Sequence, residues 1–177
     1  MFSTEKCPVP TQTMLNEYSR NGAYVDCYST EIPGHVSFSE FIYAFYTTLL
    51  FKLERLILEL TVSKPSTNSQ ARQLANGEID KFAAWHVERR SENELLMCDF
   101  RGRTRSWLTV VPVGTISSPR TRLYFGSAVV PLRNSKTGEL SLGIVFQALL
   151  GFHKLYSTLL LHFAALHIKS QRLRDEI

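Results

Sequence analysis

Residues 140–168 read LSLGIVFQALLGFHKLYSTLLLHFAALHI, and this stretch decides the fold of the chain. It is almost unbroken apolar sequence of helical length, it contains the step Gly151-Phe152-His153-Lys154, and a charged segment follows it. A long apolar helix that follows a series of strands can close a curved sheet over a core or a pocket. Because such a helix is apolar on most sides, it needs cover from the rest of the fold, a ligand, a membrane surface or a second subunit.

The same segment is also the candidate for a membrane span. Residues 142–161 have the required length of about 20 residues. However, His153 and Lys154 lie near the middle, and a lysine at the bilayer centre costs about 2.5–3.5 kcal/mol on insertion scales. We therefore expect a helix buried within the fold and no transmembrane span, with contact to a membrane surface as an alternative.

Length and composition indicate one globular domain. The chain has 177 residues, of which 44% are hydrophobic and 20% charged, and its formal net charge is +4. A chain of this length buries about 70% of the surface that its unfolded form exposes. We expect a loose arm over residues 1–20, a single domain over residues 21–170 and a charged tail over residues 171–177. The 20 basic residues are scattered among 16 acids, so nucleic-acid binding is not expected.

The cysteines and the N-terminus bear on the compartment. Cys7, Cys27 and Cys98 are odd in number and widely spaced, which argues against a disulfide framework and fits a reducing compartment. We expect them to be small buried hydrophobic residues. Residues 1–13 lack the basic start and apolar run of a secretory signal. The sequence therefore favours a cytoplasmic protein.

Runs of strand-forming residues predict an antiparallel meander. Residues 23–32 are rich in Tyr, Val, Cys and Thr and stop at Pro33-Gly34, as a strand before a turn does. Four further strand candidates are joined by loops short enough for hairpins. They lie at residues 82–90, 94–100, 104–113 and 121–132.

Helix signals lie between and after these strands. Ser37 and Glu40 match a capping box that starts a helix, and the apolar stripe behind it continues to about residue 62, with a break at Thr47-Thr48. Three- and four-residue steps predict which side chains of the terminal helix lie on the sheet. They are Phe152, Leu155, Tyr156, Leu159, Phe163 and Leu166, whereas Leu160, Leu161 and Ile168 need cover from elsewhere.

This order of elements resembles the helix-grip arrangement of the START-like (SRPBCC) superfamily, which includes polyketide cyclases and lipid- or quinone-carrying proteins. The resemblance covers about residues 23–169, and the Gly151-Phe152-His153-Lys154 step is similar to the opening of the last helix in a bacterial branch near that superfamily. It implies an α+β fold in which a long C-terminal helix grips a curved antiparallel sheet of about five or more strands, with a helix or helix pair after the first strand. It also implies a cavity between sheet and helix for a lipid, a quinone or a polyketide-like molecule.

Candidate site residues are few. His153 could exchange a proton near neutral pH, and Arg105 is expected to pair across a hairpin with Asp99; these are the candidate catalytic residues if the protein is an enzyme. A structural role is nevertheless the favoured explanation: a hydrogen-bonded histidine for His153, and a solvated hairpin end for the pair of Arg105 with Asp99. The candidates for a ligand wall are Trp85, Trp107, Tyr124, Phe152, Tyr156 and Leu159.

Three functions follow, and none of them requires a metal or a cofactor. His162 and His167 are five residues apart on a helix with no Cys or acid at ligand spacing, so no metal site is expected. The leading hypothesis is binding of a small hydrophobic ligand; the alternatives are a polyketide cyclase or dehydratase-like enzyme and a non-catalytic homodimerisation or interaction module. A pocket with a buried titratable group favours the enzyme, whereas a filled core with an exposed apolar helix face favours the interaction module.

Overall fold

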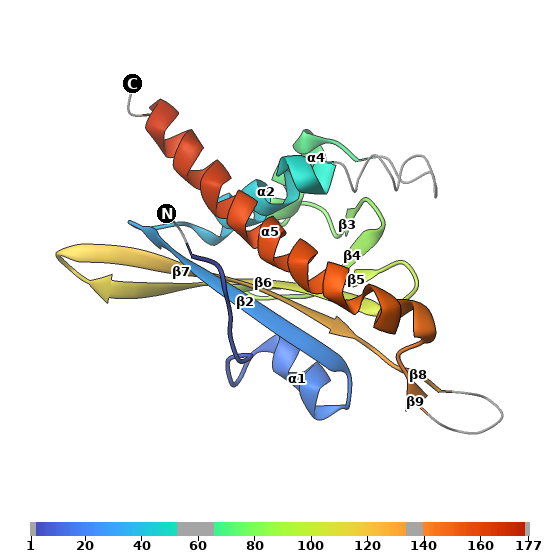
Figure 1. Cartoon of the computed structure of the whole chain (residues 1–177). Helices are drawn as coiled ribbons and strands as arrows, with labels where there is room; N and C mark the ends of the chain where they lie inside the picture. Colours follow the sequence, from blue (N-terminus) through green and yellow to red (C-terminus); the bar gives the residue numbers. More distant parts are fainter. Residues whose placement is uncertain (1–2, 53–65, 134–139, 176–177) are drawn as a thin grey trace.

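A computed structural model of the chain describes residues 3–52, 66–133 and 140–175. The protein is an α+β structure built on a seven-stranded antiparallel sheet (Figure 1). In order across the sheet the strands are β1 (Glu5–Lys6), β2 (Tyr24–Pro33), β7 (Ser118–Val129), β6 (Thr104–Thr115), β5 (Glu94–Asp99), β4 (Trp85–Arg90) and β3 (Lys81–Phe82). The predicted fold class is confirmed, including the meander and the long C-terminal helix.

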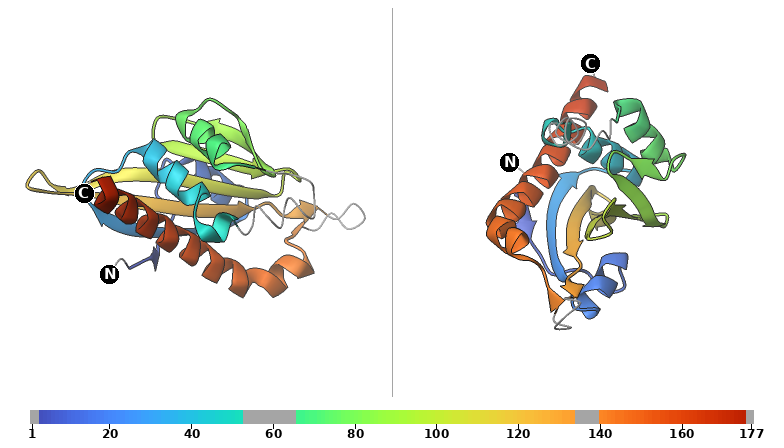
Figure 2. Two further views of the ribbon diagram at one scale, coloured as in Figure 1. Left: turned by 90° about the horizontal axis from the view of Figure 1, so that it is seen from above. Right: turned by 90° about the vertical axis from the view of Figure 1, so that its right-hand side faces the viewer.

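Helices cover both faces of this sheet (Figure 2). They are α1 (Met14–Arg20) on one face, and α2 (Phe38–Tyr46), α4 (Asn68–Asn76) and α5 (Ile144–Asp175) on the other. A separate pair of short strands, β8 (Leu132–Arg133) and β9 (Leu140–Ser141), precedes α5. Within the described ranges, no helix has the length and apolar character needed to cross a membrane.

The N-terminal segment is more ordered than the sequence suggests. Residues 1–20 were expected to form a loose arm, but β1 pairs with β2 and α1 packs on the sheet. Leu15 of α1 is fully buried against Gly126, where an added Cβ atom would clash with the Leu15 side chain. The segment contributes to a second, smaller core that contains Leu15, Cys27, Leu96, Trp107 and Ala128.

Helix α2 starts where the capping signal places it. The Ser37 hydroxyl accepts a hydrogen bond from the Glu40 amide at 3.1 Å. The Glu40 carboxylate does not complete the capping box; it binds the Arg172 guanidinium of α5 at 3.1 Å. The expected charged tail over residues 171–177 thus begins as a helical segment that docks on α2.

Aromatic side chains fill the space between the sheet and α2. The Phe45 ring lies 4.9 Å from the Phe125 ring of β7, and the Tyr46 ring lies 4.9 Å from Phe51 and 5.4 Å from Phe82, measured between centroids. All five side chains are at most 5% exposed. Such interlocked rings leave the described part of this layer packed as a solid core.

Helix α5 lies on the sheet with a different face from the predicted one. The side chains at the contact with β2, β7 and α2 are Ser157, Leu160, Leu161, Ala164, Ala165 and Ile168, all at most 2% exposed. Of the six predicted contact residues, Tyr156 packs against the core, but four turn outward: Phe152 is 65% exposed, Leu155 58%, Phe163 40% and Leu166 40%. The predicted register is therefore wrong, because both sides of the helix are apolar and periodicity alone does not distinguish them.

This register gives a matched pair of stability predictions. We expect Leu161→Ala to lower the free energy of unfolding by about 2–5 kcal/mol, because it removes a fully buried side chain and leaves a cavity. Leu155→Ala, on the outward side of the same helix, should cost less than about 1 kcal/mol. Urea unfolding of both variants at low protein concentration measures the difference, and equal losses would contradict the observed register.

Candidate functional site

A buried carboxylate lies where β2 and β7 run beneath α5. Asp26 and Ser127 are direct cross-strand neighbours, and each is 2% exposed. The Ser127 hydroxyl donates a hydrogen bond to Asp26 Oδ1 at 2.6 Å, and the Tyr24 hydroxyl donates one to Oδ2 at 3.2 Å. A buried carboxylate needs such donors, because an ion transferred out of water without partners is strongly destabilising.

His153 reaches this pair from α5. Its Nε2 atom lies 2.9 Å from Ser127 Oγ and 3.3 Å from Asp26 Oδ2. The Ser127 hydroxyl already donates its hydrogen to Asp26. The Nε2 atom of His153 must therefore be the donor in the hydrogen bond between the ring and this pair. The cluster thus holds α5 to strands β2 and β7, and sequence analysis selected only its histidine.

The three residue types resemble a hydrolase triad, but their geometry differs. In a triad the serine and the carboxylate bind different ring nitrogens, so that the ring can accept the serine proton. Here both Ser127 and Asp26 lie at the same Nε2 atom, and the serine hydroxyl donates its hydrogen bond to the carboxylate. This arrangement holds the cluster together and does not activate Ser127 as a nucleophile.

The electrostatics of the cluster favour an ionised Asp26. Burial by itself would raise the pKa of Asp26, but the hydrogen bonds from His153 and Ser127 outweigh it and hold this pKa below its usual value. Burial, together with the nearby Asp26 charge, raises the pKa of Tyr28 to about 12 and raises the pKa of Tyr24 as well. Both phenols therefore stay protonated around the carboxylate.

The other two candidate catalytic residues do not meet as predicted. Arg105 lies opposite Cys98, and its guanidinium binds Glu88 at 2.9 Å and Tyr18 of α1 at 3.0 Å. Asp99 accepts hydrogen bonds from the hairpin amides of Arg103 and Thr104 at 2.6 and 2.9 Å. The predicted Asp99–Arg105 pair is wrong, because the turn itself satisfies Asp99.

These placements separate the three candidates. Arg105 points to the α1 face of the sheet, whereas His153 approaches from the α5 face. Asp99 is bound to backbone amides at the β5–β6 turn. They do not form one catalytic site.

The residues expected to line a ligand cavity are also distributed over both faces. Trp107 is fully buried in the smaller core, where its Nε1 atom donates a hydrogen bond to Glu94 at 2.7 Å. Tyr124 packs against the same core, and its ring lies 6.3 Å from the Trp107 ring. Trp85 packs instead against the larger core on the α5 side.

The remaining cavity candidates belong to α5. Tyr156 packs against the larger core, and the Phe152 ring stacks on it from outside at 5.9 Å. Leu159 is partly exposed on the outward side of the helix. The cavity candidates therefore do not share one enclosed space.

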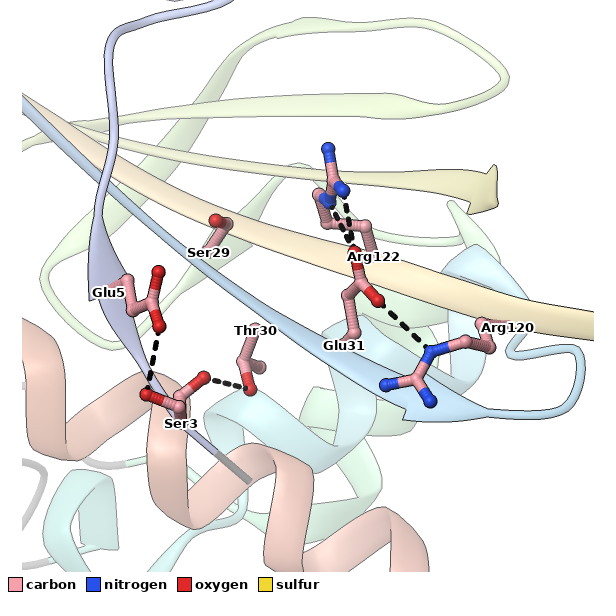
Figure 3. A pocket seen from close by; sticks show the side chains of 7 residues that line it. All are labelled: Ser3, Glu5, Ser29, Thr30, Glu31, Arg120 and Arg122. Atoms are coloured by element: carbon pink, nitrogen blue, oxygen red, sulfur yellow. Dashed lines mark hydrogen bonds and ion pairs between the residues drawn. The ribbon is translucent and has the colours of Figure 1, made fainter. Parts of the chain in front are cut away.

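A polar hollow of about 450 Å³ lies beside the edge formed by β1 and β2 (Figure 3). It is lined by Ser3, Glu5, Ser29, Thr30, Glu31, Arg120 and Arg122. Glu31 accepts hydrogen bonds from Arg122 Nε at 2.9 Å and from Arg120 Nε at 3.0 Å, so two guanidinium groups share one carboxylate. Its wall is polar, with the charges of the two arginines balanced by Glu5 and Glu31, and we call it the arginine hollow.

A second hollow of about 340 Å³ lies between the end of α2 and the outward side of α5. It is lined by Thr47, Thr48, Leu49, Lys52, Phe163, Leu166, His167, Ser170 and Arg174. Leu49 is 82% exposed at its rim and extends the apolar surface of α5 towards α2. We call it the α5 hollow.

No known protein family, curated protein or solved structure matches the chain. The resemblance to the START-like superfamily therefore stays a prediction. Within the described part of the chain, no group of three or more His, Cys, Asp or Glu side chains is placed to hold a metal ion. The functional interpretation rests on the geometry of this chain.

The buried carboxylate gives a pH-dependence prediction. The pKa of Asp26 is lower in the folded protein than the value of about 3.9 expected in the unfolded chain. Its charge therefore contributes stability above about pH 4, and this contribution is lost as the pH falls through the folded pKa. Asp26→Asn should be less stable than the wild type at pH 7 and should lose less stability on acidification.

Denaturant unfolding at several pH values between 7 and 3 measures this difference. Glu92→Gln is the control, because it removes an exposed carboxylate from the β4–β5 turn and leaves the cluster intact. Parallel pH profiles for Asp26→Asn and the wild type would show that the Asp26 cluster is not a source of stability.

Proposed function

We propose that the protein is a non-catalytic interaction module that forms a homodimer through the outward face of α5. The observation that carries the proposal is the run of exposed apolar side chains along one side of this helix. Phe152, Leu159, Leu166 and Leu173 recur at seven-residue steps, and Leu155 and Phe163 flank them. Leu173 is 53% exposed, so the run continues into the last turns of the helix.

A continuous apolar face of this kind favours a partner. At a rise of about 1.5 Å per residue, the run from Phe152 to Leu173 is roughly 30 Å long. Soluble monomers rarely expose contiguous apolar patches larger than a few hundred Å². A seven-residue repeat of apolar side chains is also the pattern with which two helices pack along a common seam.

The charges on α5 favour a second copy in antiparallel orientation. Lys169 and Arg174 are exposed near the C-terminus of the helix, whereas Arg172 is paired with Glu40 of α2. Two parallel helices would bring these basic ends together. In the antiparallel pairing each basic end lies beside the other copy's N-terminal half, whose outward face is uncharged around Phe152 and Leu155.

The α5 hollow fits this orientation. It is lined on α5 by Phe163, Leu166, His167, Ser170 and Arg174. If the twofold axis crosses α5 near residue 161, Phe152 of the second copy lies beside Ser170. The most exposed ring of the outward face would then enter the hollow of the other copy.

The other two hypotheses receive less support from the geometry. In the described part of the chain, aromatic rings occupy the layer between sheet and helices that the ligand hypothesis needs. The enzyme hypothesis requires its candidate residues to converge, and they lie on different faces. Binding of a hydrophobic ligand and cyclase-like chemistry stay predictions from the sequence.

Sedimentation equilibrium at micromolar concentration tests the dimer. We expect a mass of twice the 20.2 kDa of one chain. Phe152→Glu and Leu166→Glu should each weaken the dimer at least about 100-fold, because a charge would be buried in an apolar contact. Lys154→Gln is the control, since it changes the net charge by the same amount. Lys154 is seven residues before the inward Leu161, so it lies on the side of the helix away from the proposed dimer contact.

Cysteine cross-linking tests the orientation, in a chain whose three native cysteines are replaced by serine. Phe152→Cys combined with Ser170→Cys should form covalent dimers, whereas Phe152→Cys alone should not. Efficient cross-linking of Phe152→Cys alone would establish a parallel pairing. A monomeric wild type that binds anionic vesicles through α5 would replace the dimer with a membrane-surface function.

A further inference from the structure

Two of the three cysteines are adjacent in space although twenty residues separate them. The Sγ atoms of Cys7 and Cys27 are 3.5 Å apart, and the Cys7 amide donates a hydrogen bond to the Cys27 carbonyl at 2.9 Å. The β1–β2 pairing continues to this point, so the two residues face each other across the strands. Cys27 is 1% exposed, whereas Cys7 is partly exposed to solvent.

The surroundings make the two thiols chemically different. The hydrogen bond from the Cys27 thiol lowers the pKa of Cys7 to about 7; burial opposes it, and Ser29 and the Arg122 charge add to it. The hydrogen bond to Cys7 and burial raise the pKa of Cys27. Cys7 is therefore the nucleophile of the pair, and Cys27 keeps its proton.

The arginine hollow lies close to the nucleophile, because two of its lining residues act on Cys7. Ser29 and Arg122 line this hollow, and both also act on Cys7. A small polar oxidant that enters the hollow would meet hydroxyl and guanidinium hydrogen-bond donors, with the charges of Arg120 and Arg122 balanced by Glu5 and Glu31. Cys7 thus combines partial exposure, a cationic neighbour and a second thiol within reach, as redox-active cysteines do.

We propose that Cys7 and Cys27 form a redox-active dithiol that small hydroperoxides oxidise to an intramolecular disulfide. The Cys7 thiolate attacks the outer peroxide oxygen, the O–O bond breaks, and the departing oxygen takes up a proton to leave as water or an alcohol. Cys7 is then a sulfenic acid. The Cys27 sulfur attacks the Cys7 sulfur, the S–O bond breaks, and hydroxide leaves as water with the Cys27 proton. Two thiols lose two electrons, and one hydroperoxide gains them.

Cys98 serves as an internal comparison. It is buried, and burial raises its pKa to about 11. Its sulfur lies 3.4 Å from the Asp99 carbonyl, and none of the described residues brings a second thiol to it. Cys98 therefore fits the reading of a small buried side chain that the sequence suggested for all three cysteines.

Disulfide formation would change the N-terminal segment. The bond would tie β1 covalently to β2 and close a loop that contains α1. The oxidised protein should therefore resist proteolysis within its N-terminal segment better than the reduced protein. The α5 dimer is not involved, because Cys7 and Cys27 belong to the α1 side of the sheet.

Intact-protein mass spectrometry after treatment with stoichiometric hydrogen peroxide tests the proposal. The wild type and Cys98→Ser should lose the mass of two hydrogen atoms, and peptide mapping should find the Cys7–Cys27 disulfide. Cys27→Ser should stop at a Cys7 sulfenic acid that dimedone traps. Cys7→Ser should show neither product. Absence of the disulfide in the wild type, or equal oxidation at Cys98, would overturn the proposal.

Alkylation kinetics give a second readout that needs no oxidant. The rate of Cys7 modification by iodoacetamide in Cys98→Ser should rise with a midpoint near pH 7. Arg122→Gln and Cys27→Ser should shift the midpoint upward, because each removes a group that favours the thiolate. Arg120→Gln is the matched control, since its guanidinium binds Glu31 and is not among the groups that act on Cys7. A midpoint above about pH 8.5, the value of an unperturbed thiol, would contradict the assigned nucleophile.

Discussion

The buried charge of Asp26 constrains the arrangement of the rest of the fold. A carboxylate that is 2% exposed must be surrounded by donors, and those donors come from β2, β7 and α5. Once His153 faces Asp26, the rotation of α5 about its axis is set. Leu161 and Ile168, two turns apart, then point into the core between the sheet and α2. The polar cluster, more than the apolar periodicity, selects which side of α5 is buried.

The choice of the buried side of α5 also determines which surface of the helix is available to a partner. Both sides of α5 are apolar, so burying one side leaves the other in solvent. The side that remains contains the heptad run, and its seven-residue spacing matches a helix–helix seam better than contact with a twisted sheet. Small residues are found on the inward side instead, where Ala164 and Ala165 let the helix lie close to β2. The rotation of α5 about its axis thus determines both the face that packs on the sheet and the face that forms the proposed dimer.

Patterns among residues close together in the sequence predicted the local structure. They did not predict which residues far apart in the sequence would pair. The Ser37 cap and the strands of the meander follow from residue types at short spacing. The pairing of Asp26 with Ser127 depends on the register between β2 and β7, which are far apart in the chain. The one sign of this site in the sequence is that Asp26 lies within a predicted strand among apolar residues, which could have indicated a buried carboxylate. The Asp99–Arg105 prediction failed by one residue, because the turn amides bind Asp99.

Strand β2 connects the two sites while keeping them on opposite faces. Successive side chains of a strand alternate between faces, so Asp26 and Tyr28 face α5 while Cys27 and Ser29 lie on the α1 side, where Ser29 lines the arginine hollow. Coupling between the dithiol and the α5 cluster would therefore have to pass through the β2 backbone. The β2–β7 ladder runs the full length of β2 and holds that backbone in place on the side away from β1. Closing a disulfide at Cys27 would thus reorganise the short β1 edge, which has few other contacts, rather than the helix that carries the proposed dimer surface.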